Sequence, residues 1–474
     1  MASPHTLDLR AYDDHAIAVL GLGVSGMSAA NALLRAGARV LAWDDNENRR
    51  NGAAARGLAP HNLETSEFAD IDMLVLSPGI PCGRPHTHPV VARARDAGIE
   101  ILCDVELLTR AAPEARYVGI TGTNGKSTTT ALIGHILSQL EIPNAIGGNI
   151  GAPALSLQAL GRDGIYVLEL SSYQLDLLPH AGFDVALLLN VTPDHLDRHG
   201  GMDGYVAAKE RIFGYQTPGQ SAVVCIDDKH SRTIFDTISA HDTATVIPVS
   251  TRDVCSGGVY LEDNWVIDNR NGICQPIIEM KTLTALPGNH NAQNVAAAYA
   301  AVTAILNDHS DETRTAITSA MGTFPGLAHR QELLGTRDGV RFVNDSKATN
   351  AEATSHALAA YENIYWIAGG IAKEGGITTL DPVFERVRHA FLIGEAAPMF
   401  AATLDGRVPS TISNNLNTAL LQAVEMAVGE AVILLSPACA SFDQYSSFTA
   451  RGDAFRIAVN SLPDFVPHIS GDTP

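Results

Sequence analysis

Gly119-Ile120-Thr121-Gly122-Thr123-Asn124-Gly125-Lys126-Ser127-Thr128 joins an apolar run that begins at Tyr117 to a helical pattern over residues 129–140. A glycine-rich turn between a strand and a helix leaves several backbone N–H groups unpaired, and the helix N-terminus adds partial positive charge. Lys126 supplies a full charge, and the two hydroxyl residues after it can reach a magnesium ion. The stretch is therefore predicted to hold a polyphosphate.

The match to the general P-loop pattern has one exception. That pattern requires a glycine five residues before Gly125, where this chain has Ile120. A glycine-rich turn without a ligand is the alternative, but it does not explain a lysine between Gly125 and two hydroxyl residues. The sequence favours a nucleotide-binding loop.

Length and composition limit the class of protein. A chain of 474 residues is too long for one core and predicts two to four domains. A net charge of −20 makes nucleic acid and anionic membranes poor partners. The first residues lack a signal-peptide core, no apolar run approaches the length of a membrane span, and the six cysteines form no CxxC pair. These features predict a reduced cytoplasm, without structural zinc or disulfides.

The first hundred residues contain a second glycine-rich turn. Residues 16–23 are predicted to form a buried strand, and residues 25–36 a helix. Between them Gly21-x-Gly23-x-x-Gly26 matches the dinucleotide-binding fingerprint, and Asp44 and Asp45 follow the next strand. The pattern predicts a nucleotide or diphosphate on the helix N-terminus, with acidic side chains near a ribose or base. A packing role for the three glycines is the open alternative.

Polar residues also follow other predicted strands. One strand of the first unit runs into Ser77-Pro78-Gly79-Ile80-Pro81, one strand beyond the P-loop ends at Glu169, and the next is followed by Asn190, Asp194 and His195. Ligands of open α/β sheets lie at the carboxyl ends of strands. A single Glu or His in such a place would more often be structural, but their occurrence after successive strands favours metal ligands or phosphate neighbours.

The remaining chain contains an antiparallel-looking insert and a third α/β pattern. Short alternating runs over residues 221–280 predict antiparallel strands and hairpins added to the nucleotide-binding core. Residues 286–294 open an alanine-rich helix that reaches about Ile305, and the Asn and His residues clustered there exceed what capping needs, which favours a nucleotide contact. After residues 324–327, strands are predicted near 340–343, 364–368, 389–393 and 431–435.

These motifs together resemble the Mur ligase family, which tolerates a residue other than glycine at the position of Ile120. Its motifs occur here in the family's order as residues 122–128, the strand with Glu169, Asn190 with residues 194–197, residues 289–294 and Asn344-Asp345-Ser346-Lys347-Ala348-Thr349-Asn350. The resemblance covers essentially the whole chain. It implies an α/β protein of three domains: a Rossmann-like UDP-sugar domain (1–110), a central P-loop ATPase domain with a parallel sheet plus a small antiparallel sheet (111–326), and a Rossmann-like amino-acid-binding domain (327–474).

The resemblance also implies an activity. Ser77-Pro78-Gly79 and residues 436–448 with Arg451-Gly452 are similar to the members that add D-glutamate to UDP-N-acetylmuramoyl-L-alanine. The implied reaction is ATP-dependent amide ligation through an acyl phosphate in peptidoglycan precursor synthesis. The implied protein is a cytoplasmic monomer that needs ATP and two Mg²⁺ ions and neither inserts into membranes nor binds nucleic acid.

The same resemblance implies the residues of each site. ATP is expected to contact Gly122, Thr123, Asn124, Gly125, Lys126, Ser127, Thr128, Asn291, Asn294, Arg330, Asp345 and Lys347. The metal ions are expected at Ser127, Glu169, His195 and a carbamylated Lys209, and the catalytic residues are Lys126, His195 and Lys209. The UDP-sugar is expected at Val24, Ser25, Asp44, Asp45, Ser77, Pro78, Gly79 and Asn149. D-Glutamate is expected at Thr349, Lys373, Ser441 and Phe448.

Lys209 depends most on the resemblance, because composition alone favours a solvated surface lysine. It ends the segment Ala207-Ala208-Lys209 on a predicted helix. Carbamylation would turn this cation into an anion that binds metal.

Three other functions fit part of the sequence. An NAD-dependent oxidoreductase would explain the first glycine-rich turn and Asp44, but not Lys126 or the third unit. A non-catalytic nucleotide-binding scaffold would release no phosphate. A Mur ligase specific for another amino acid is also possible, because the P-loop does not identify the amino acid. The run Asp44-Asp45-Asn46 stands where some members have an arginine, which leaves the uridine contacts open.

Overall fold

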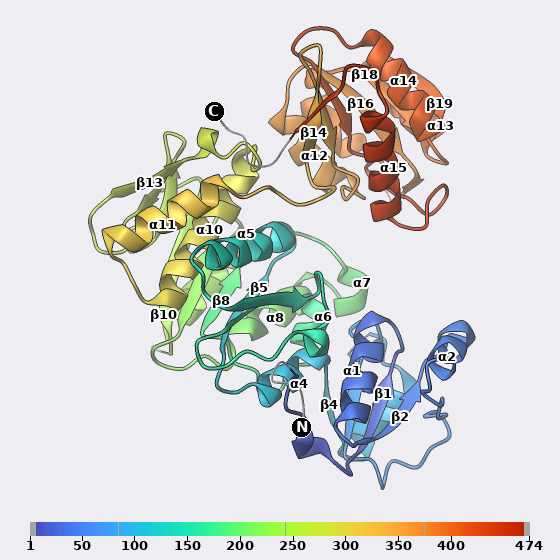
Figure 1. Ribbon diagram of the computed structural model, residues 1–474, viewed down its shortest axis with the longest axis vertical. Coiled ribbons are helices and arrows are strands. Elements are labelled where there is room, and N and C mark those ends of the chain that lie inside the picture. The colour runs from blue at the N-terminus through green and yellow to red at the C-terminus, as the bar shows by residue number, and fades with distance from the viewer. Residues whose placement is uncertain (1–5, 84, 242, 374, 469–474) are drawn as a thin grey trace. The chain divides into compact units, whose positions relative to one another are not determined.

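The computed structural model describes residues 6–468 except 84, 242 and 374, and leaves out the side chains of residues 289 and 290. Its contacts divide the chain into two compact units. The first contains Met1–Ile278 and Gln293–Met321, and the second contains Glu279–Ala292 and Gly322–Pro474 (Figure 1). No helix among the described residues is long and apolar enough to cross a bilayer.

The first unit begins with a four-stranded parallel sheet in the order β2-β1-β3-β4. Its strands are β1 (Ala16–Leu20), β2 (Arg39–Trp43), β3 (Met73–Leu76) and β4 (Glu100–Leu102), and its helices are α1 (Val24–Arg35), α2 (Glu47–Ala54), α3 (Pro89–Asp96) and α4 (Asp104–Ala111). The glycine turn packs α1 against the end of β1: Gly21 has φ +92°, and a Cβ on Gly26 would lie 1.7 Å from the Gly21 carbonyl oxygen. Glycine is required at both positions.

The same unit continues into a nine-stranded sheet of described residues, in the order β13-β12-β11-β10-β9-β8-β5-β7-β6. The strands are β5 (Arg116–Thr121), β6 (Asn144–Gly148), β7 (Ile165–Glu169), β8 (Val185–Leu188), β9 (Ser221–Cys225), β10 (Thr245–Ser250), β11 (Val259–Glu262), β12 (Trp265–Asp268) and β13 (Gln275–Glu279). The helices are α5 (Lys126–Gln139), α6 (Ser172–Leu175), α7 (Leu196–His199), α8 (Met202–Glu210), α9 (Lys229–Ser239), α10 (Asn289–Leu306) and α11 (Asp311–Gly322). Because β5 lies between β7 and β8 and is parallel to both, all three strands end at the same edge.

One prediction for this sheet is wrong. The strands β9 and β10 were expected to be antiparallel, but β9 pairs in parallel with β8 and β10 in parallel with β9. The reason is α9, which supplies the crossover between them and whose N-terminus is capped by the side chain of Asp228. The antiparallel pairing expected farther along occurs between β11 and β12, which extend the same sheet.

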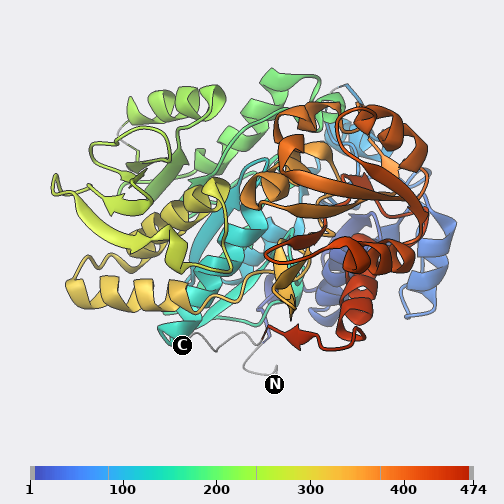
Figure 2. The same cartoon turned by 90° about the horizontal axis from the view of Figure 1, so that it is seen from above.

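The second unit is built on a seven-stranded sheet in the order β19-β18-β16-β20-β15-β14-β22. Its strands are β14 (Glu332–Arg337), β15 (Val340–Asn344), β16 (Ile364–Gly369), β18 (Val387–Ile393), β19 (Ser410–Asn414), β20 (Val432–Leu435) and β22 (Val466–Pro467), and β17 (Ile371–Ala372) pairs separately with β21 (Cys439–Ala440). The helices α12 (Ala351–Ala360), α13 (Ala397–Leu404), α14 (Leu416–Met426) and α15 (Phe448–Asn460) flank both faces (Figure 2). The predicted α/β class is confirmed.

Candidate active site

The P-loop is fixed in place by the end of the neighbouring strand β8. The Asn124 amide donates to Asn190 Oδ1 at 2.8 Å, and Asn190 Nδ2 donates back to the Asn124 carbonyl at 3.1 Å. Gly122 and Gly125 have φ of +152° and +87°, and a Cβ on Gly125 would lie 2.3 Å from Asn294 Oδ1. The loop therefore needs glycine at both positions, and Asn294 lies directly beside it.

Lys126 curls back over the loop that precedes its helix. Its Nζ donates to the carbonyl oxygens of Gly122 and Thr123, both at 2.9 Å. Ser127 is buried and Thr128 half-buried in the first turn of α5. The loop thus presents a cation and a helix N-terminus at the carboxyl end of a central parallel strand, where a phosphate group binds most favourably.

Lys209 converges on the same loop from α8. Its side chain is 1% exposed, its Nζ donates to the Gly122 carbonyl at 2.8 Å, and it lies 4.6 Å from the centre of the Tyr205 ring. Burial lowers the pKa of Lys209 well below its usual value, and the charge of Lys126 lowers it further. Lys209 is not a solvated surface lysine.

Glu169 has the features of a cation ligand. Its side chain is buried at the end of β7, where Oε1 accepts from Asn149 Nδ2 at 2.8 Å. Its Oε2 is buried and has no hydrogen-bond partner among the described residues. A buried carboxylate oxygen left unpaired is costly, so a cation at this oxygen would satisfy it.

His195 lies in a strained turn before α7. It has φ +52°, its side chain is 50% exposed, and its ring is 5.3 Å from that of Tyr173. Asp194 Oδ2 is 3.4 Å from its Nε2. The described part of the chain contains no group of three or more His, Cys, Asp or Glu side chains that could hold a metal. A metal at Glu169 or His195 would therefore need ligands of other kinds.

The residues predicted for a UDP-sugar lie around the first glycine turn, except Asn149, which hydrogen-bonds Glu169 at the end of β7. Asp44 is 3% exposed, and its carboxylate accepts from the backbone amides of Leu22 at 2.6 Å and Asn46 at 2.8 Å. Asp45 pairs with His88 at 3.0 Å, and Ser77 Oγ donates to the Gly21 carbonyl at 2.8 Å. The carboxyl ends of β1, β2 and β3 thus converge. Val24 is exposed, Ser25, Ser77 and Pro78 are half-buried, and Gly79 is exposed.

In the second unit Asp345 occupies a buried position after β15. Ser436 Oγ donates to its Oδ2 at 2.8 Å, and the Gln331 amide donates to its Oδ1 at 3.1 Å. Burial raises the pKa of Asp345 to about 7, although both hydrogen bonds oppose that shift. Nearby, Lys347 Nζ lies 3.9 Å from the centre of the Phe448 ring.

Of the remaining predicted D-glutamate residues, Lys373 is exposed, Thr349 is half-buried, and Ser441 is buried. Ser441 Oγ has no hydrogen-bond partner within the described residues. A buried hydroxyl without a partner suits a residue that hydrogen-bonds a ligand.

Arg451 is a functional candidate that the predicted site residues did not include. It is 1% exposed on α15, and its guanidinium donates to Ser346 Oγ at 3.0 Å, to the Ser346 carbonyl at 2.9 Å and to the Cys439 carbonyl at 3.1 Å. Burial lowers the pKa of Arg451 to about 10. It holds together the segments that carry Asp345, Ser441 and Phe448. The sequence signal was the pair Arg451-Gly452, which marked the family but no role.

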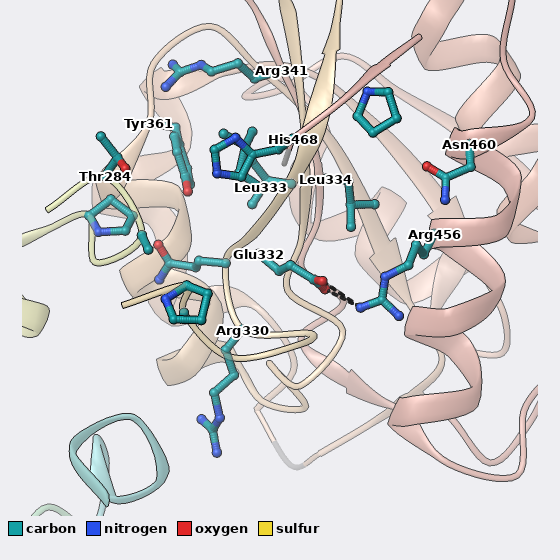
Figure 3. A pocket seen from close by; sticks show the side chains of 17 residues that line it. Thr284, Arg330, Glu332, Leu333, Leu334, Arg341, Tyr361, Arg456, Asn460 and His468 are labelled. Atoms are coloured by element: carbon teal, nitrogen blue, oxygen red, sulfur yellow. Dashed lines mark hydrogen bonds and ion pairs between the residues drawn. The ribbon is translucent and has the colours of Figure 1, made fainter. Parts of the chain in front are cut away.

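A pocket of about 280 Å³ lies in the second unit (Figure 3). Arg330, the predicted ATP residue among its lining, extends away from the paired side chains of Glu332 and Arg456. That ion pair has two contacts, at 2.6 and 2.8 Å. Arg341 and Tyr361 line the other end.

The raised pKa of Asp345 predicts a pH dependence of stability. The folded chain holds a proton that the unfolded chain releases above its ordinary pKa of 3.8. The stabilisation from this proton is complete below about pH 4 and is lost as the pH rises to about 7. Between these pH values the free energy of unfolding should fall by up to about 4 kcal/mol because of Asp345. Asparagine does not titrate, so this part of the fall should be absent from Asp345→Asn. Denaturant titrations of the wild type and of Asp345→Asn between about pH 4 and pH 8 check this. The prediction is contradicted if the free energy of unfolding depends on pH equally in the two proteins.

Family models match two stretches of the chain. The model described as Mur ligase MurD-like, N-terminal domain, matches residues 15–103, and the Mur ligase middle domain matches residues 120–302. Curated UDP-N-acetylmuramoylalanine–D-glutamate ligases align over almost the full length. That of Rhodospirillum rubrum is 49% identical over 96% of both chains, and that of Caulobacter vibrioides is 47% identical over 96% of this chain and 98% of its own.

Solved structures share the fold at low sequence identity. The UDP-N-acetylmuramate–alanine ligase MurC of Thermotoga maritima is 16% identical, with a TM-score of 0.57 over 94% of this chain and 99% of its own. A UDP-N-acetylmuramoyl-L-alanyl-D-glutamate–2,6-diaminopimelate ligase is 17% identical, with a TM-score of 0.55 over 96% and 95%. The family models and the relatives that align over 96% of this chain show that the chain belongs to the Mur ligase family.

Proposed function

We propose that this chain is an ATP-dependent amide ligase that adds D-glutamate to UDP-N-acetylmuramoyl-L-alanine during cytoplasmic synthesis of peptidoglycan precursors for the cell wall. The observation that carries the proposal is the convergence of Lys126 and the buried Lys209 on the Gly122 carbonyl of a P-loop. The curated relatives named for this reaction support the choice of substrates.

The reaction proceeds in two balanced steps. A carboxylate oxygen of the L-alanyl group attacks the γ-phosphorus of ATP, an O–P bond forms, and the bond from that phosphorus to the bridging oxygen breaks as ADP leaves with its electrons. The amine of D-glutamate then attacks the acyl carbon, phosphate leaves with the bonding electrons, and a proton is released as the amide forms. Because a carboxylate and a triphosphate repel each other, the site must hold positive charge where they meet, and Lys126 supplies it.

Metal binding would complete the central site. We assign two Mg²⁺ positions to Ser127, Glu169, His195 and a carbamylated Lys209, and when bound these ions would neutralise the phosphates. The unpaired Oε2 of Glu169 supports this assignment. Lys209 supports it as well, because its lowered pKa favours the neutral amine that reacts with carbon dioxide.

The substrates are assigned to three domains, residues 1–110, 111–326 and 327–474. The UDP-sugar lies on the glycine turn with the Ser77–Gly79 loop, and ATP on the P-loop with Asn291, Asn294, Arg330, Asp345 and Lys347. D-Glutamate contacts Thr349, Lys373, Ser441 and Phe448, with Lys373 pairing with a carboxylate. The protein acts as a monomer.

Glu169→Gln is expected to raise the Mg²⁺ concentration needed for half-maximal turnover by about 10- to 100-fold. The amide keeps the size of the side chain and the contact to Asn149, but it removes the anionic charge. The melting temperature should not fall, because a buried charge is lost. The exposed Glu114, paired with Arg162 at 2.6 Å, provides the control variant Glu114→Gln. Equal magnesium dependence in both variants would refute the assignment.

Oxygen transfer tests the proposed reaction. With ¹⁸O in the acceptor carboxylate, the released phosphate should contain one ¹⁸O atom, and the product should contain D-glutamate in amide linkage. Turnover requires ATP, acceptor and D-glutamate together. Phosphate without the label would exclude the acyl phosphate, and no phosphate at all would favour a nucleotide-binding scaffold.

A further inference from the structure

The loop after β3 is held by a side chain from α7, a helix that follows a strand of the other sheet of the first unit. Arg198 Nη2, on α7, donates to the carbonyl oxygens of Pro78 at 3.4 Å and of Ile80. These contacts join positions 120 and 118 residues apart in sequence. The loop follows β3 of the four-stranded sheet, whereas α7 follows β8 of the nine-stranded sheet and begins directly after His195.

The direction of the Arg198 side chain is fixed by an aromatic stack. Its guanidinium carbon lies 4.9 Å from the centre of the Tyr173 ring. The same ring is stacked against His199 at 5.5 Å and contacts His195 at 5.3 Å. His199 is itself held by a 2.9 Å contact between its Nε2 and Ser172 Oγ. A guanidinium resting on a ring directs its N–H groups along the ring plane, which a lysine ammonium cannot reproduce.

Arg198 also keeps its charge available. Within the described residues it forms no ion pair, and the nearby acid Asp176 lies 3.3 Å from Arg211 Nε. Burial raises the pKa of Asp176, and Arg198 is one of the cations that oppose this shift. The neighbouring acids Asp194 and Asp197 raise the pKa of Tyr173, whereas the charge of Arg198 lowers it. A cation that donates to neutral carbonyls adds positive potential beside the Ser77–Ile80 loop.

We propose that Arg198 is a positioning residue that ties the acceptor loop at Pro78 and Ile80 to the turn that carries His195, and so sets the acceptor diphosphate relative to the P-loop. This inference rests on the proposed function, because it assigns the Ser77–Gly79 loop to the UDP-sugar. Acyl phosphate formation needs the acceptor carboxylate within bonding reach of the γ-phosphate, and a displacement of about 1 Å can cost about 100-fold in rate.

The test compares Arg198→Ala and Arg198→Lys with a matched control. Arg95 Nη2, on α3, donates to the Cys82 carbonyl, so Arg95→Ala removes a similar guanidinium–carbonyl contact whose two partners both come from residues 1–110. We expect both Arg198 variants to raise the KM for UDP-N-acetylmuramoyl-L-alanine about tenfold and to lower kcat by up to about 100-fold. The KM for ATP should stay within about twofold. Added methylguanidinium should raise the turnover of Arg198→Ala and should leave the turnover of Arg95→Ala unchanged.

Calorimetry separates this inference from the proposed function. Acceptor binding to Arg198→Ala, without ATP or D-glutamate, should be about tenfold weaker than to the wild type. If the wild type binds the acceptor but releases no phosphate with D-glutamate, the proposed function fails while a weakened Arg198→Ala still supports the tether. Unchanged acceptor affinity in Arg198→Ala overturns the tether, as does an equal rise in the KM of acceptor and ATP, or a failure of methylguanidinium to restore activity.

Discussion

Lys126→Ala is expected to lower ATP turnover by about 100- to 1000-fold, because it removes a cation from the position where transferred phosphate accumulates charge. The same change should leave folding intact. The Lys126 side chain is half-buried on the P-loop and donates to the carbonyls of Gly122 and Thr123 rather than packing in the hydrophobic core. Its removal also relieves repulsion with the buried Lys209.

Steady-state phosphate release and thermal melting together check this prediction. Lys126→Arg is a useful companion, because it keeps the charge but changes its shape and reach. A melting temperature that collapses in parallel with activity would mean that Lys126 is structural. Turnover close to that of the wild type would mean that the P-loop does not act through this lysine.

Lys209→Ala is expected to reduce turnover by at least about 100-fold and to recover when short carboxylic acids are added. The reasoning starts from burial, since a side chain 1% exposed beside another lysine loses its proton readily. The neutral amine attacks carbon dioxide, an N–C bond forms, and a proton is released, which leaves a carbamate anion. An anion next to Lys126 and a metal is favourable where an ammonium is not. A short acid in the cavity of the alanine variant would replace that anion.

The carbamate can be observed directly. Protein equilibrated with ¹³C-labelled bicarbonate should show a carbamate carbon resonance that is absent from Lys209→Ala. The exposed Lys281, paired with Glu279, provides the control variant Lys281→Ala, which should keep both the signal and the activity. Lys209→Ala that remains fully active without added acid would refute the carbamate.

The buried parallel strands were predictable because each is an apolar run that ends in polar residues. This held for β1, β5, β7 and β8, whose side chains are all or nearly all buried. Edge strands lack that signal. β19 (Ser410–Asn414) lies at one edge of its sheet and mixes polar and apolar residues. β14 lies next to the edge strand β22, has an irregularity between Leu333 and Gly335 and pairs antiparallel with β15. Neither was expected, because sheet edges are only partly buried.

The site residues also differ in how far they could be predicted from the neighbouring sequence. Gly125, Lys126 and Glu169 could be predicted because their local setting, a turn or a strand end, carries the chemistry. The placement of Lys209 could not, since a lysine on a helix is ordinarily solvated. Arg198 and Arg451 were missed as site residues for a related reason. Their partners lie about a hundred residues away in sequence, and only the folded sheets bring them together.

Release of phosphate with different amino acids tests the central claim most directly. The screen offers L-alanine, D-glutamate, L-lysine and diaminopimelate, each with ATP and with UDP-N-acetylmuramate or UDP-N-acetylmuramoyl-L-alanine. We expect phosphate release only when D-glutamate is present and only when the acceptor is UDP-N-acetylmuramoyl-L-alanine, not UDP-N-acetylmuramate. Release that does not require D-glutamate would contradict the account and favour a Mur ligase of different amino-acid specificity.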